Sequence, residues 1–142
     1  MALDCQRTKV NDVLNVKSVN DVLNVVNYPF VMTTGRVLYH YHTATMSRLS
    51  KGIMERCPES LVEINPKDAE KLGVSAGQFV KVSSRRGEVQ AKSEVTTRVS
   101  EGTIFMNFHF REAAVNLLTN PALDPIAKIP EYKVCAVKVE AA

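Results

Sequence analysis

The stretch Glu63–Val89, EINPKDAEKLGVSAGQFVKVSSRRGEV, decides the fold of this chain. It begins as the apolar strand LVEI ends. Asn65 is then placed to cap a helix, with Pro66 at its first position and Asp68 in its first turn. Gly73 is typical of the residue just beyond a helix C-terminus. We therefore predict a short helix over 66–72 that packs Ala69 and Leu72 against a sheet.

A β-hairpin is predicted directly after this helix. Residues 78–84 alternate in polarity, with Val80 and Val82 on one face and Phe79, Lys81 and Ser83 on the other. The ArgArgGly sequence at 85–87 forms the turn, and residues 88–96 return as a second strand. The order of elements is therefore strand, helix and hairpin.

The rest of the chain adds short strands and irregular connections. Strands are expected at 29–35, where the strand ends in a turn, and at 61–64, 103–107 and 133–139. A long loop with a helical turn is expected at 40–52, and a helix at 112–118. Pro121, Pro125 and Pro130 interrupt regular structure between the last two elements. Many short strands with brief helices indicate a mainly β domain, a barrel or a sandwich.

The first residues differ from the remainder. VNDVLNV occurs twice, at Val10–Val16 and Val19–Val25, and its apolar spacing permits a weak amphipathic helix. Val and Asn are poor helix formers. We interpret residues 1–27 as an arm or linker and residues 28–142 as one β-barrel domain.

Composition excludes several classes of function. The 142 residues are 45% hydrophobic and 23% charged, which is typical of a globular domain. A net charge of +3 without a Lys/Arg-rich run argues against nucleic acid, and no apolar stretch is long enough for a membrane span. No signal pattern begins the chain, so a cytoplasmic location is expected. Cys5, Cys57 and Cys135 fit no disulfide framework or metal motif and are expected to be reduced thiols.

The run Thr33–Arg48, TTGRVLYHYHTATMSR, carries the chemistry. It joins a Thr-Thr-Gly turn to two Arg and two His, and no acidic residue occurs between Phe30 and Gly52. Hydroxyl, imidazole and guanidinium donors without negative charge suit a large anionic ligand.

Five motifs in order carry a family resemblance: TTGRVLYHYHTATMSR, INPKDAEKLG, VSSRRGEV, FMNFHF and the run Asn116–Glu140, NLLTNPALDPIAKIPEYKVCAVKVE. Over about Tyr28 to Glu140 the chain resembles the C-terminal domain of the molybdopterin oxidoreductases, and most closely that of formate dehydrogenase catalytic subunits. The resemblance implies a double-psi β-barrel. It also implies that the domain helps to hold molybdopterin guanine dinucleotide, the ligand of molybdenum or tungsten.

The resemblance also implies cofactor contacts at particular positions. Arg36, His40 and His42 match cofactor contacts; the two His, alternating along an extended run, are expected to point the same way. Gly35 would let backbone N–H groups approach the ligand closely. The remaining expected contacts are Thr34, Thr43, Phe108, Asn116, Tyr132 and Lys133, with Arg48 as a further cation.

Simpler interpretations stay open for several of these residues. Tyr39 and Tyr41 alternate with the two His, so the tyrosines can be the buried side and the imidazoles solvated. His109 has one face toward the core and another that can reach the cofactor. Lys133 can be a solvated edge lysine, and Arg85 and Arg86 an exposed hairpin tip.

The resemblance covers one domain of a longer enzyme. In the family, the iron–sulfur domain, the metal-ligating Cys or selenocysteine and the catalytic His–Arg pair lie upstream of this domain. No catalytic residue, metal ligand or iron–sulfur cluster is therefore expected in this chain. Its expected partners are the remaining domains or subunits of a molybdopterin oxidoreductase, and cofactor binding by the isolated chain is expected to be weak.

Two alternative functions remain. The chain can serve another member of the superfamily, of the formylmethanofuran dehydrogenase or nitrate reductase type, although the HYHT stretch favours the formate type. It can also be a non-enzymatic double-psi barrel that mediates interactions, as in the N-terminal domains of some AAA ATPases. Such barrels have no reason to keep a GRxxxHxH loop.

Overall fold

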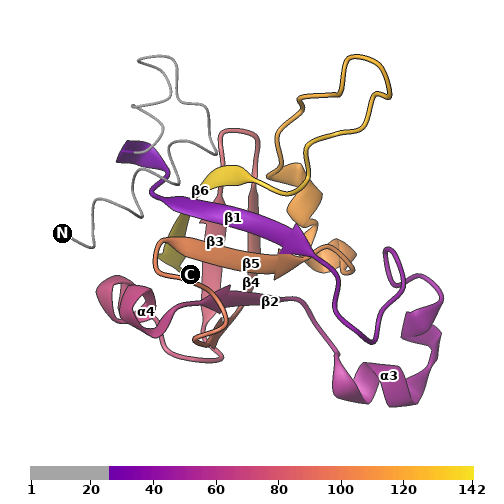
Figure 1. The fold of residues 1–142 in the computed structure, drawn as a ribbon. Helices are drawn as coiled ribbons and strands as arrows, with labels where there is room; N and C mark the ends of the chain where they lie inside the picture. The colour runs from indigo at the N-terminus through magenta and orange to yellow at the C-terminus, as the bar shows by residue number, and fades with distance from the viewer. Residues whose placement is uncertain (1–25) are drawn as a thin grey trace.

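The structure, a computed structural model, describes residues 26–142, so the repeated segment of the predicted arm lies outside the described residues (Figure 1). Six strands close into one barrel in the order β1-β5-β2-β4-β3-β6. The strands are β1 Phe30–Gly35, β2 Leu61–Ile64, β3 Phe79–Ser83, β4 Glu88–Val95, β5 Thr103–Asn107 and β6 Cys135–Ala141. The helices and 3-10 turns between them are η1 Ser47–Leu49, α3 Lys51–Arg56, α4 Pro66–Leu72, η2 Arg111–Ala113 and η3 Val115–Leu117.

The strand pairings have an internal two-fold relation. β1 pairs with β5, and β2 with β4, in parallel, whereas the other four pairs are antiparallel. Exchanging β1 with β4, β2 with β5 and β3 with β6 leaves this set of pairings unchanged. Every pair joins a strand of the first half, β1 to β3, to a strand of the second half, β4 to β6. This interlocked, closed sheet is the predicted double-psi β-barrel.

The alternation seen in the sequence places the core. Val80 and Val82 are fully buried inside the barrel, whereas Phe79 on the opposite face of β3 is 50% exposed. Met32, Ile64, Ile104 and Met106 from the neighbouring strands are also fully buried. Period-2 patterning thus assigned the two faces of β3 correctly.

Helix α4 forms as predicted. The Asn65 side chain accepts a hydrogen bond from the backbone N–H of Lys67, and Gly73 ends the helix in the left-handed conformation at φ 65°. Ala69 is buried and Leu72 packs against the core.

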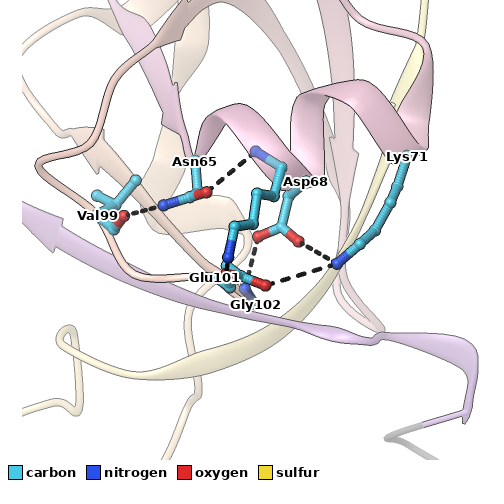
Figure 2. A network of polar contacts seen from close by, with 7 residues as sticks. Asn65, Asp68, Lys71, Val99, Glu101 and Gly102 are labelled. Atoms are coloured by element: carbon cyan, nitrogen blue, oxygen red, sulfur yellow. Dashed lines mark hydrogen bonds and ion pairs between the residues drawn. The ribbon is translucent and has the colours of Figure 1, made fainter.

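Polar contacts tie α4 to the turn that precedes β5 (Figure 2). The Asn65 amide donates to the Val99 carbonyl oxygen at 2.8 Å. The Asp68 carboxylate, only 4% exposed, accepts from the Gly102 N–H at 2.6 Å and from the Lys71 ammonium at 3.3 Å. The side chains just after β2 therefore hold the connection that follows β4.

We expect Asp68→Asn to lower the free energy of unfolding by about 0.5–1.5 kcal/mol, the value of a typical net hydrogen bond. The amide keeps an oxygen for the Gly102 N–H but loses the charge that strengthens it. Urea denaturation measures the change. Glu70→Gln, on the exposed face of the same helix, is the control, and equal losses in the two variants would contradict this role of Asp68.

Two expectations need correction. The predicted helix at 112–118 is a pair of 3-10 turns, because Ala114 between them leaves the helical region with ψ at 72°. The last strand begins at Cys135 rather than Lys133. Lys133 and Tyr132 instead cross the end of β1, as described below.

Candidate functional site

The parallel strands β1 and β5 end side by side, with Gly35 opposite Asn107 (Figure 1). Two connections leave this end of the barrel. One is residues 36–46, which lead to η1 and are here called the rim loop. The other is residues 108–134, which lead to β6. Eight of the ten expected cofactor contacts lie on these connections, and Thr34 and Gly35 lie directly before the first of them.

His109 holds the rim loop from inside the molecule. Its side chain is fully buried. Nε2 accepts a hydrogen bond from the Val37 N–H at 2.9 Å, and Nδ1 lies within hydrogen-bond distance of the His42 carbonyl oxygen. Because a carbonyl only accepts and an N–H only donates, the ring must be the neutral Nδ1–H tautomer. The role that the sequence left open for His109 is therefore a bridge between two points of the loop.

The two histidines of the rim loop do not point the same way, because the loop is not extended. His40 is 5% exposed; its Nε2 donates to the Cys57 carbonyl oxygen at 2.7 Å and its Nδ1 accepts from the Ser47 hydroxyl at 2.9 Å. His42 is exposed, with a left-handed φ of 45°. The predicted alternation is wrong.

The opposite interpretation is also wrong. Tyr39 and Tyr41 are 41% and 67% exposed, so neither is the buried side of an alternating run. The Tyr41 ring packs edge-on against His42 with 4.2 Å between centroids.

Arg36 is an exposed cation at the rim, which is the end of the barrel where β1 and β5 finish. Its guanidinium carbon lies 6.0 Å from the centre of the Phe108 ring, which is half-buried. Within residues 26–142, no carboxylate pairs with this guanidinium. Its planar N–H fork is therefore available to an anion.

Tyr132 and Lys133 are brought to the end of β1 by two hydrogen bonds. The Thr34 hydroxyl donates to the Tyr132 carbonyl oxygen at 2.6 Å, and the Lys133 ammonium donates to the Thr34 carbonyl oxygen at 3.0 Å. Thr34 itself is 3% exposed. Thr34 therefore positions this segment, and Lys133 keeps N–H groups and a full charge for a ligand.

Gly35 is also constrained from inside the protein. It is the last residue of β1 and not part of a turn. A Cβ atom there would lie 2.6 Å from Cε2 of Phe105 on the neighbouring strand. The glycine therefore makes room for a ring of this chain.

The remaining candidates lie at the periphery. Asn116 is exposed on η3, and the exposed Thr43 hydroxyl shares a hydrogen bond of 3.1 Å with Thr45. Arg48 forms a two-bond ion pair with Glu112, at 2.7 and 3.0 Å. This pairing leaves Arg48 less suited to an anion than Arg36.

The two described thiols and Arg86 add no reactive group. Cys57 and Cys135 are free, and burial raises the pKa of Cys135 to about 11, so its thiol stays neutral. Cys5 lies outside the described residues. Arg86, expected at a solvated tip, donates to the Leu118 carbonyl oxygen at 2.8 and 3.0 Å. Across residues 26–142, no cluster of three His, Cys, Asp or Glu side chains fits a metal ion.

A groove of about 320 Å³ lies elsewhere on the described part of the chain, and the ten candidate residues do not line it. Two ion pairs line it, Arg48 with Glu112 and Lys92 with Glu59. Its lining consists of Arg48, Pro58, Glu59, Ser60, Phe79, Gln90, Ala91, Lys92, Phe110, Glu112 and Ala113. The candidate site is therefore the rim and not this groove.

Burial is the main reason why the pKa of His109 is lowered. The nearby His40, Arg36 and His42 lower this pKa further, whereas the hydrogen bond to the His42 carbonyl raises it. The depressed pKa favours the neutral ring that the hydrogen bonds require. In the unfolded chain, His109 has the ordinary histidine pKa of 6.5. Folding therefore releases a proton at pH values between the folded pKa and 6.5.

We expect the contribution of His109 to stability to be complete above pH 6.5 and to decline as the pH falls below it. Urea denaturation at about pH 7.5 and about pH 5.5 measures this loss. The loss should be smaller in His109→Leu, which has no group to protonate. A loss of the same size in both proteins would show that other groups cause it.

Comparisons with known proteins agree with this architecture. Residues 30–136 match the family described as "Molydopterin dinucleotide binding domain". The chain is 57% identical over 113 residues to the F420-dependent formate dehydrogenase 1 subunit alpha of Methanococcus maripaludis, a match that covers 80% of this chain and 17% of that protein. The F420-dependent formate dehydrogenase subunit alpha of Methanocaldococcus jannaschii is 54% identical over 114 residues, with the same coverage.

A solved structure shows the same fold. Acetylene hydratase from Pelobacter acetylenicus superposes with a TM-score of 0.72 at 17% identity, over 89% of this chain and 20% of that one. No helix within residues 26–142 is both long and apolar enough to cross a membrane. The chain thus spans about a sixth of the length of the formate dehydrogenase relatives, at 17% of each. By the match over residues 30–136, it belongs to the molydopterin dinucleotide binding domain family.

Proposed function

We propose that this chain holds molybdopterin guanine dinucleotide in a molybdenum or tungsten formate dehydrogenase. Three F420-dependent formate dehydrogenase alpha subunits are 50–57% identical to it over most of its length. The chain spans 17% of these proteins. We therefore infer that the residues that oxidise formate lie in the remaining domains or subunits, and that these are the partners of this chain.

The observation that carries this proposal is the state of Arg36. Its guanidinium is exposed at the end of the parallel pair β1/β5, beside Phe108, and no described carboxylate neutralises it. The rim loop that follows contains no acidic residue. A planar cation without a carboxylate partner suits a pyrophosphate oxygen or a pterin carbonyl.

The chemistry of the rim fits a dinucleotide. Arg36 and Lys133 offer positive charge, and the exposed imidazole of His42, the Thr43 hydroxyl and the Asn116 amide offer further donors. When bound, the metal–pterin group would supply the two-electron redox chemistry. The residues of this chain would bind and orient it.

The expected contacts divide into two groups. Arg36, His42, Thr43, Phe108 and Lys133 are exposed or half-buried at the rim, and we assign them, together with Asn116 and the Tyr132 ring, to direct contact. Thr34, Gly35 and His40 are engaged inside the protein. We assign these three to shaping the rim.

A nitrate reductase is the second candidate. The nitrate reductase of Symbiobacterium thermophilum is 44% identical over 119 residues, covering 81% of this chain and 16% of that protein. The lower identity places this assignment behind the formate dehydrogenase.

Binding of the cofactor by the 142-residue chain tests the proposal. Molybdopterin guanine dinucleotide released anaerobically from a molybdenum enzyme is dialysed to equilibrium against the chain. Bound pterin is measured by fluorescence after denaturation and iodine oxidation, and guanine nucleotide by chromatography. We expect saturable retention of pterin and guanine together. A folded chain that retains neither at any concentration would refute the proposal.

A further inference from the structure

We propose that His109 is a positioning residue, which holds the rim loop in the shape that receives the dinucleotide. This inference rests on the proposed function, because the loop carries Arg36 and His42. His109 itself is fully buried and is not offered as a ligand contact.

The His109 imidazole bridges two points of the rim loop. The imidazole accepts from the Val37 N–H at 2.9 Å and donates to the His42 carbonyl oxygen. These two groups flank the segment 37–42, so one ring fixes both of its ends. Arg36 directly precedes the first bonded residue, and His42 is the second. The placement of both candidate contact residues, Arg36 and His42, therefore depends on this ring.

Neighbouring rings pack against the His109 imidazole. It packs against the rings of Phe108 and His40, with centroids 5.0 and 5.8 Å away. Loss of the imidazole would leave the Val37 N–H and the His42 carbonyl oxygen, whose hydrogen bonds are partly buried, without this partner. The loop would then have to open to water to satisfy them.

The two-fold relation of the barrel gives this bridge a counterpart at the opposite end. The exchange that maps β2 onto β5 also maps β4 onto β1, so the residues after β2 correspond to those after β5. After β2, Asn65 and Asp68 hold the turn that follows β4, through Val99 and Gly102 (Figure 2). After β5, His109 holds the loop that follows β1. Both ends of the barrel thus use side chains behind one parallel strand to fix the connection of its neighbour.

Three variants test the inference. His109→Leu removes both hydrogen bonds, whereas His109→Gln keeps an amide that can satisfy one of them. Asn65→Ala is the matched control, because it loosens the corresponding turn at the opposite end of the barrel. Amide hydrogen exchange of Val37 reports the rim loop, exchange of Val82 reports the barrel, and equilibrium dialysis reports the affinity for the cofactor.

In His109→Leu we expect Val37 to exchange at least about tenfold faster, as local opening without global unfolding permits, while Val82 is unchanged. Affinity for the cofactor should fall about tenfold, and His109→Gln should be intermediate in both. Asn65→Ala should change neither readout. Nitrogen chemical shifts of wild-type His109 should report the Nδ1–H tautomer.

The outcomes separate this inference from the proposed function. Unchanged Val37 exchange in His109→Leu would overturn the inference whatever the cofactor does. Faster exchange with unchanged affinity would also overturn it, because the loop would be free without consequence. Faster exchange in a chain whose wild type binds no cofactor would refute the proposed function but leave the hold of His109 on the loop standing.

Discussion

Arg36→Gln is expected to weaken binding of molybdopterin guanine dinucleotide by about 10- to 150-fold. A hydrogen bond to a charged group contributes about 1.5–3 kcal/mol, and each 1.4 kcal/mol is about a factor of ten in the dissociation constant. Glutamine keeps an N–H donor and much of the side-chain length, so the variant removes chiefly the charge and the planar fork. Equilibrium dialysis with pterin detection gives the two dissociation constants.

Arg56→Gln is the matched control. Arg56 is exposed in the last turn of α3 and is not among the expected cofactor contacts. It should leave the dissociation constant unchanged and the dependence on salt as in the wild type. Arg36→Gln should reduce the salt dependence, because the lost contact is ionic. If the Arg36→Gln chain bound as tightly as the Arg56→Gln chain, Arg36 would not be a cofactor contact, and the proposed function would lose its main support.

The sequence predicted those parts of the fold that are determined by residues close to one another in the sequence. The caps of α4 at Asn65 and Gly73, the hairpin at 85–87 and the inward face of Val80 and Val82 are local signals, and all three were confirmed. The closed barrel followed from the family resemblance, because short alternating strands are compatible with several β architectures.

The rim could not be predicted in the same way, because contacts distant in sequence decide its shape. His40 and His42 alternate in the sequence, yet the carbonyl of His42 is held by His109, 67 positions later. His40 turns inward to the Cys57 carbonyl, 17 positions later. The sequence therefore yielded a list of candidate donors, but it did not separate the exposed donors from those that are hydrogen-bonded inside the protein.

Gly35→Val is expected to destabilise the folded chain by about 1–3 kcal/mol, the usual cost of forcing extra atoms into a packed site. The Cβ would lie 2.6 Å from Cε2 of the Phe105 ring, closer than any normal contact between carbon atoms. The ring is half-buried, so it must move toward solvent or the strands must separate. Urea denaturation measures the loss in free energy of unfolding.

A double-mutant cycle with Phe105→Ala separates the two reasons for a glycine at this position. If the ring is the obstacle, Gly35→Val should cost little in the Phe105→Ala background, because the conflicting atoms are gone and valine favours strands. The coupling between the two changes should then approach the whole cost of Gly35→Val. If instead the glycine serves close approach of the ligand, as the resemblance implied, Gly35→Val should keep its stability and lose affinity for the cofactor. Equal costs in both backgrounds would contradict the role assigned to Phe105, since the ring would then not be what valine displaces.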